Sequence, residues 1–212
     1  MSIERFINER AIQSVVHFTT NHGAVGILAS NGLKSRHRLN TDEQLARIFQ
    51  PNARDRNKDT AWLDYANLSI SRINTSFFAY SGNWHKEQDF FWCIFDFSPE
   101  IMTHDGVWFT TTNNIYTGVR RAHGLAGIEA AFQQTTTLWS GNVVTRPANH
   151  PSYLPTCPQA EILYPGEVST QYLQRIYARC DSDSDAIAGQ MYAMGHREIP
   201  VVVNPDLFGH IK

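Results

Sequence analysis

Two short segments, far apart along the chain, each place a chemically useful side chain in an apolar, strand-like stretch. In residues 158–164, PQAEILY, Gln159 and Glu161 are two positions apart, so a strand would turn both to the same face. A carboxylate at the mouth of an apolar strand is costly to bury without a function. The alternative is an edge-strand glutamate that faces water, and this segment alone leaves both interpretations open.

The second segment is VVHFTT at residues 15–20, in which His17 interrupts an apolar run that is typical of a short buried strand. Thr20 or Asn21 follows as a potential helix cap, and the helix should end near Gly32. Taken alone, His17 is explained more simply as a histidine whose hydrogen bonds are satisfied within the fold.

Several common catalytic motifs are absent from the sequence. It contains no Rossmann-type glycine-rich turn, no phosphate-binding loop, no His-Glu-x-x-His helix and no Gly-x-Ser-x-Gly turn. Its nine histidines and three cysteines show no metal-ligand spacing. We therefore expect no metal, and any nucleotide chemistry must use a different kind of site.

Composition limits the class of protein. The chain has 212 residues, of which 42% are hydrophobic, so we expect one domain with a substantial core. The longest apolar run covers residues 90–95, far short of the ~20 residues of a membrane helix. With no leader-like N-terminus and an odd number of cysteines, the sequence favours a reduced, cytoplasmic protein without membrane contact.

Charge is distributed unevenly along the chain. The formal net charge is −2, but residues 34–58 hold seven Lys or Arg and three acidic residues. Such a basic patch can steer a polyanion toward one side of an otherwise acidic protein. The alternative is an ordinary solvated helix face.

The order of the expected elements indicates an α+β fold. Helices are expected after His17 (residues 21–31), from Thr41 to Pro51, and at 116–134 and 184–194. Strands are expected at 14–18, 75–80, 90–97, 106–110, 159–164, 174–178 and 199–203. The polar stretch 135–158 is too long for an ordinary connection, and loops of that length are usually functional.

Several motifs, taken in chain order, resemble the DarT group of DNA ADP-ribosyltransferase toxins, within the diphtheria-toxin-like ADP-ribosyltransferase superfamily. The matching segments are HFT at 17–19, the GLK helix exit at 32–34, RDRN at 54–57, LDYANLSI at 63–70, VWFTT at 107–111 and QAE at 159–161. The resemblance implies a single domain, residues 1–212, built on a split, strongly bent β-core that holds NAD between its halves. NAD-binding elements would then occupy residues 14–80, a substrate-recognition loop 135–158, and the catalytic strand 159–164.

The resemblance also implies roles for two catalytic residues. Cleavage of the N-glycosidic bond of NAD passes through an oxocarbenium-like transition state, which the Glu161 carboxylate would stabilise. Glu161 would also contact the ribose 2′-hydroxyl and accept a proton from the incoming base. Arg54 would pair with the pyrophosphate or polarise the base, although Arg47 or Arg56 are alternatives for this role.

The remaining implied contacts are with NAD and with the acceptor. His17, Phe18 and Thr19 would bind the ribose and the nicotinamide carboxamide, and a neutral imidazole suits a ribose diol. Tyr65 and Phe78 would pack on the nicotinamide ring, unless they are simply core residues. Gln159 would read the acceptor base, and four loop residues, Trp139, Arg146, His150 and Tyr153, would contact unpaired bases.

We therefore expect an NAD-dependent transferase that modifies guanine or thymine in single-stranded DNA. The resemblance implies a toxin of a toxin–antitoxin or phage-defence system, with a DarG-type macrodomain antitoxin as partner. Residues 71–74, SRIN, depart from the Asn/Pro/Arg-rich stretch of the family, which suggests a divergent branch. The alternatives are an RNA or protein acceptor, a stand-alone NAD hydrolase, and a catalytically silent nucleic-acid-binding module.

Overall fold

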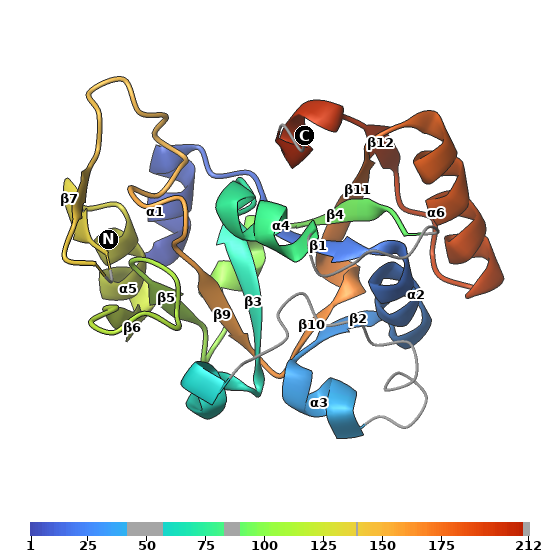
Figure 1. Ribbon diagram of the computed structural model, residues 1–212, viewed down its shortest axis with the longest axis horizontal. Helices are drawn as coiled ribbons and strands as arrows, with labels where there is room; N and C mark the ends of the chain where they lie inside the picture. Colours follow the sequence, from blue (N-terminus) through green and yellow to red (C-terminus); the bar gives the residue numbers. More distant parts are fainter. Residues whose placement is uncertain (42–56, 83–89, 139, 210–212) are drawn as a thin grey trace.

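The computed structural model describes residues 1–41, 57–82, 90–138 and 140–209 (Figure 1). Its main element is an eight-stranded sheet of order β12-β11-β4-β1-β3-β9-β5-β6. These strands are β1 (Val15–Thr20), β3 (Tyr65–Ile70), β4 (Trp92–Phe97), β5 (Trp108–Thr110), β6 (Arg121–His123), β9 (Ile162–Pro165), β11 (Leu173–Ala178) and β12 (Val201–Val203). The expected α+β class is confirmed.

Two small strand pairs and six helices of the described residues complete the fold. The pairs are β2 (Gly32–Lys34) with β10 (Glu167–Ser169), and β7 (Thr135–Thr137) with β8 (Val143–Thr145). The helices are α1 (Ile3–Arg10), α2 (Asn21–Ser30), α3 (Arg36–Thr41), α4 (Thr75–Gly82), α5 (Gly124–Ala131) and α6 (Asp181–Ala193). Short 3-10 turns cover Asn57–Trp62, Pro99–Thr103, Thr170–Tyr172 and Pro205–Phe208.

The main sheet consists of two halves that meet between β1 and β3. β1 pairs with β4 along its whole length, from Val15↔Phe97 to Thr20↔Trp92. With β3, in contrast, it pairs only at Val15↔Ile70 and Val16↔Ser69. The two halves therefore separate from His17 onward, as the resemblance implied for a split β-core (Figure 1).

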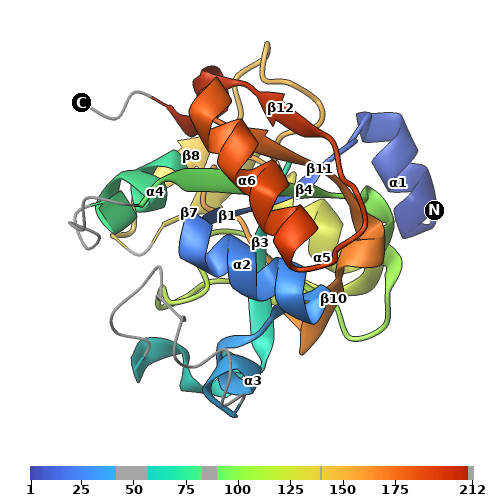
Figure 2. The same ribbon diagram turned by 90° about the vertical axis from the view of Figure 1, so that its right-hand side faces the viewer.

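Alternation along β1 buries its side chains in two different cores. Val15 belongs to the larger core, which packs α1, α2, α5 and α6 against one side of the sheet. Figure 2 shows α2 and α6 next to each other on this side. Val16 and Phe18 belong to a smaller, aromatic core with α4 and Phe208. His17 lies between these apolar positions and is only half-buried.

The helix after β1 forms as the sequence indicates. The Thr20 hydroxyl accepts a hydrogen bond from the Gly23 amide (3.3 Å), which caps α2. The helix ends at Asn31, whose φ of 55° is left-handed, rather than at Gly32. A Cβ at Gly32 would meet the Glu167 side chain of the neighbouring β10, which would have to move to accept a larger residue.

The expected strand at 75–80 is wrong, because these residues form helix α4. The aromatic residues of this segment suggested a strand, but the preceding Asn74 acts as a helix cap. Its side-chain oxygen accepts from the Phe77 amide at 3.0 Å, which satisfies one of the unpaired N–H groups of the first turn. Phe78 and Ser81, three positions apart, then form the buried face.

Three other predictions need correction in their boundaries. The expected helix 116–134 is reduced to α5, because residues 121–123 pair with β5 as β6. The long loop 135–158 contains the β7–β8 hairpin. The expected strand 159–164 begins only at Ile162, after a turn at 158–159. The helix expected from Thr41 to Pro51 lies outside the described residues, apart from Thr41 itself, which ends α3.

Candidate active site

Glu161 is fixed at the start of β9 by the neighbouring strand β5. The Thr110 amide donates to the Glu161 carbonyl, and the Glu161 amide donates to the Thr110 hydroxyl oxygen, both at 2.9 Å. The same hydroxyl donates to the Thr112 carbonyl at 2.6 Å. Since Thr110 is fully buried, the backbone at Glu161 has little freedom to move.

The Glu161 carboxylate is held by the loop that joins β5 to β6. The main-chain N–H of Asn114 donates to Glu161 Oε2 at 2.7 Å. Asn114 is itself fully buried, and its side-chain and main-chain oxygens accept from the Arg121 guanidinium on β6. The carboxylate is half-buried, and these contacts orient it through hydrogen bonds to fixed groups.

Aromatic side chains occupy the same half of the sheet. Strand register aligns Asn67, Leu163, Trp108 and His123 across β3, β9, β5 and β6. Trp108 stacks on His123 with ring centroids 4.3 Å apart, and Trp62 packs edge-on against Trp108 at 5.6 Å. Because Glu161 precedes Leu163 by two positions, alternation places the carboxylate on the face that carries this aromatic row, Trp62, Trp108 and His123.

His17 is anchored across the split in the sheet. Its Nδ1 lies 2.9 Å from the Asn67 carbonyl oxygen on β3, and because a carbonyl only accepts, Nδ1 carries the proton. Burial lowers the pKa of His17 below its usual value, and the bond to Asn67 offsets part of this effect. The imidazole is therefore neutral near pH 7, which leaves Nε2 as the acceptor nitrogen.

The sheet brings His17 and Glu161 to strands on either side of β3. Ser69 pairs with Val16 of β1, and the neighbouring Leu68 pairs with Ile162 of β9. β1 and β9 are therefore the two neighbours of β3 where the sheet is still continuous. Residues 144 positions apart in the sequence thus lie at one end of the split.

The other residues predicted to contact NAD have different surroundings. Phe18 and Thr19 are buried on β1, and Phe18 packs against Phe78 with ring centroids 5.1 Å apart. Phe78 is only 1% exposed and also contacts Trp92 and Phe208, so it is a core residue. Tyr65 is half-buried at the start of β3, with its ring 4.9 Å from that of Trp62.

The recognition loop is held by its own side chains. The Arg146 guanidinium donates to the carbonyl oxygens of Pro151 and Leu154, at 2.7 and 2.8 Å, and lies over the ring of Phe132. Burial lowers the pKa of Arg146 from its usual value. Arg146 therefore shapes the loop, whereas Tyr153 is exposed.

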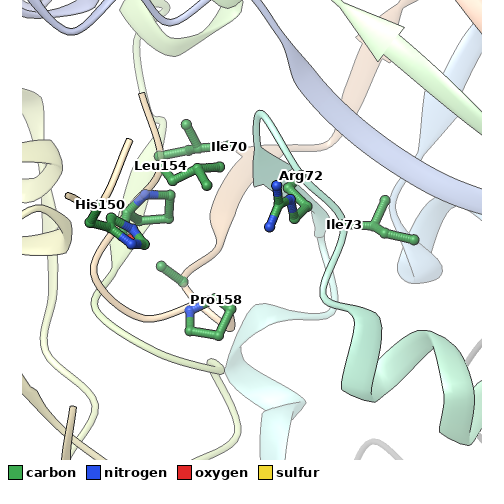
Figure 3. A pocket seen from close by; sticks show the side chains of 8 residues that line it. Ile70, Arg72, Ile73, His150, Leu154 and Pro158 are labelled. Carbon is green, nitrogen blue, oxygen red and sulfur yellow. The ribbon is translucent and has the colours of Figure 1, made fainter. Parts of the chain in front are cut away.

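A small pocket lies between this loop and the end of β3 (Figure 3). It has a volume of about 110 Å³, and Arg72 and His150 line it from opposite sides. The remaining lining is apolar and comes from Ile70, Ile73, Leu154, Pro155, Pro158 and Ala160. His150 Nε2 lies 3.1 Å from the Pro155 carbonyl oxygen, so this imidazole also helps to hold the loop.

Gln159 does not share a strand face with Glu161 as expected. It is half-buried in the turn before β9, where Pro158 and Ala160 border the pocket. The predicted residues Arg54 and Trp139 lie outside the described residues, as do the alternatives Arg47 and Arg56. Their places relative to Glu161 stay predictions.

Sequence reasoning missed the residues that hold Glu161. Thr110 belongs to the recognised VWFTT segment, but the pattern gave no sign that its hydroxyl binds another strand. Asn114 and Arg121 stood in or beside a segment interpreted as helix. An arginine on a short strand that follows a polar, glycine-containing loop is the available signal, and it is weak.

Within the described residues, no His, Cys, Asp and Glu side chains cluster in a way that would hold a metal ion. The same part of the chain contains no helix long and apolar enough to cross a membrane.

The fold of the chain is similar to that of solved DarT structures. The structure of Thermus sp. 2.9 DarT in complex with NAD+ matches with a TM-score of 0.62 and 14% identity, covering 92% of this chain and 97% of that one. The same protein with ADP-ribosylated ssDNA gives a TM-score of 0.63, at 14% identity and 93% and 97% coverage. Thermosipho africanus DarTG in complex with ADP-ribose gives 0.57, at 14% identity, 92% of this chain and 51% of that chain.

The sequence itself decides the family. The model of the family described as ssDNA thymidine ADP-ribosyltransferase, DarT, matches residues 16–209. The chain therefore belongs to the DarT family. A search of curated proteins finds no match. The predicted family, the enzyme class and NAD as co-substrate are thereby confirmed.

Proposed function

We propose that this enzyme transfers ADP-ribose from NAD to thymine in single-stranded DNA, with Glu161 as the catalytic carboxylate. The family description supports thymine, and the relative solved with ADP-ribosylated ssDNA supports the acceptor class. The observation that carries the proposal is the fixed carboxylate of Glu161, beside the split in the sheet and opposite a neutral, anchored His17.

The residues of the site fit NAD. Nδ1–H of His17 is committed to the Asn67 carbonyl, so Nε2 can accept a hydrogen bond from a ribose hydroxyl. NAD supplies an electrophilic ribose carbon when its bond to nicotinamide breaks. Glu161, held by Asn114 and Thr110, stabilises the positive charge that grows on the ribose. The carboxylate also accepts the proton that the base nitrogen loses as it bonds to that carbon.

The acceptor is expected to approach along the aromatic row and the recognition loop. Bases of a single strand stack readily on exposed aromatic rings, and an unpaired base needs no energy to leave a duplex. His123 is exposed at the end of the row, on the face that carries Glu161. Tyr153 offers a second exposed ring on the loop.

Mass spectrometry of defined oligonucleotides tests the proposal. The protein is incubated with NAD and single-stranded DNA oligonucleotides, each of which contains only one kind of candidate target base. RNA of the same sequences and a protein pool are tested in parallel. We expect the mass of one ADP-ribosyl group on thymine-containing DNA, and none with Glu161→Gln. Modification of guanine would change the assigned base, and modification of RNA or protein alone would overturn the acceptor class. NAD cleavage at the same rate without nucleic acid would indicate a hydrolase.

We further propose a toxin role with a macrodomain antitoxin of the DarG type as partner. The supporting observation is the likeness to Thermosipho africanus DarTG, of which this chain covers about half. Expression in a bacterial host should arrest growth, and co-expression of a macrodomain that removes ADP-ribose from DNA should restore it. Growth arrest by the Glu161→Gln variant would contradict this role.

A further inference from the structure

Arg121 forms a paired contact with one buried residue of the loop between β5 and β6. Its Nε donates to the side-chain oxygen of Asn114, and one terminal nitrogen donates to the Asn114 carbonyl, both at 2.5 Å. Two parallel N–H groups in one plane fix an acceptor more tightly than a lysine ammonium can. The guanidinium also lies 5.4 Å from the ring centroid of Trp62, which limits its movement on that side.

Asn114 passes this constraint to Glu161. Its main-chain N–H donates to Glu161 Oε2 at 2.7 Å, and the residue is fully buried. The carbonyl and the side chain of Asn114 belong to the same residue as this N–H, so holding both restricts the backbone rotations that would turn the N–H away from the carboxylate. The orientation of Glu161 therefore depends on a chain of contacts that begins at Arg121.

We propose that Arg121 is a positioning residue for transfer, which acts on Glu161 through Asn114. The inference rests on the proposed role of Glu161. Displacement of a catalytic carboxylate by about 1 Å from its productive position can lower the rate by up to ~100-fold. Substrate binding is affected less, since Arg121 is proposed to act on the orientation of Glu161 rather than on NAD.

The neighbouring arginine provides a matched control. Arg120 is adjacent in the sequence, but it is exposed and its guanidinium binds the side-chain oxygen of Gln133 at 3.0 Å. Arg120→Ala and Arg121→Ala remove the same charge from adjacent positions. A difference between them therefore reports the contacts of Arg121 with Asn114 and Trp62 rather than the charge.

Single-turnover and steady-state transfer to a thymine-containing single strand test the proposal. We expect Arg121→Ala to lower kcat by about 10- to 100-fold with little change in KM for NAD. Arg120→Ala should resemble wild type. Added guanidinium ion should restore part of the kcat of Arg121→Ala and none of that of Glu161→Gln, a rescue that a merely structural role would not show.

A second variant covers the case in which Arg121→Ala does not fold. Asn114→Ala keeps the main-chain N–H but removes one of the two acceptors for Arg121, so kcat should fall in the same direction by a smaller factor. If Arg121→Ala and Asn114→Ala both keep the wild-type kcat while Glu161→Gln is inactive, the role of Arg121 is overturned and the proposed function is not. Wild-type kcat in Glu161→Gln would instead overturn the proposed function.

Discussion

Each half of the sheet contains a carboxylate, Glu161 in one half and Asp96 in the other, and their environments differ. Glu161, on the half formed by β3, β9, β5 and β6, is half-buried and accepts from the main-chain N–H of Asn114. Asp96 lies on β4, in the other half, and is completely buried. Arg175 Nε is 3.2 Å from its Oδ2, and the Tyr177 hydroxyl donates to the same oxygen at 3.4 Å.

Burial raises the pKa of Asp96 above its usual value, and Ser14, Arg175 and Tyr177 offset this only in part. A raised pKa is often taken as a mark of catalysis, but structural ion pairs produce it as well. Asp96 pairs in register with Val16, so it faces the side of the sheet that carries the smaller aromatic core. It lies on β4, in the half of the sheet that does not carry the aromatic row. The comparison shows that access and orientation, rather than a raised pKa, identify the catalytic candidate.

The largest expected difference between the two carboxylates is in activity. Glu161→Gln should lower transfer by ~10²–10³-fold, because the amide cannot stabilise the positive charge on the ribose. The fold should persist, since the amide oxygen still accepts from Asn114. The matched variant Asp96→Asn should retain activity close to wild type. Transfer rates measured with labelled NAD check both, and equal losses in the two variants would remove the distinction.

The Thr110 hydroxyl is expected to matter next. Thr110→Val removes the hydrogen bond from the Glu161 amide and the one to the Thr112 carbonyl, which should cost about 2 kcal/mol of unfolding free energy. Thr110→Ser keeps the hydroxyl and should stay near wild type. Urea denaturation measures both changes. A Thr110→Val protein as stable as Thr110→Ser would show that the hydroxyl does not hold β9.

The ion pair of Asp96 should contribute to stability in a pH-dependent way. Arg175→Met leaves a buried carboxylate without its cation, and we expect a loss of about 1–2 kcal/mol at pH 7, reduced because the Arg175 side chain is 43% exposed. As the pH falls, the raised pKa of folded Asp96 lets its carboxylate take up a proton before that of the unfolded chain does, so its attraction to Arg175 is lost and the loss should shrink. Denaturation at several pH values checks this, and an equal loss at every pH would contradict it.

The smallest effect concerns His17. Because its pKa is lowered in the folded state, the unfolded chain binds a proton first as the pH falls below ~6.5, which costs the native state stability. The unfolding free energy of wild type, relative to that of His17→Gln, should therefore fall from pH 7.5 to pH 5.5, by at most about 1.4 kcal/mol. A difference that moves in favour of wild type over this range would mean that His17 is protonated on folding.

The sequence alone predicted the family and most elements of the sheet, because those depend on local patterns. Apolar runs mark strands such as β1 and β4 wherever they pair, and the Thr20 cap acts only on the helix that follows it. Helix α4 was missed because aromatic residues favour both strands and buried helix faces, and only the Asn74 cap distinguishes the two.

His17 and Glu161 could likewise be selected from residue type and position, but their supporting residues could not. The hydrogen bond from the Glu161 amide to the Thr110 hydroxyl spans 51 residues of chain, and the bond from the Asn114 amide to the Glu161 carboxylate spans 47. Such contacts depend on the register between β5 and β9, and a shift of one residue would turn every side chain to the opposite face. The chain's own order of residues thus determined which groups can react, whereas the pairing of distant strands decided which neutral donors hold the carboxylate and which carboxylate stays buried.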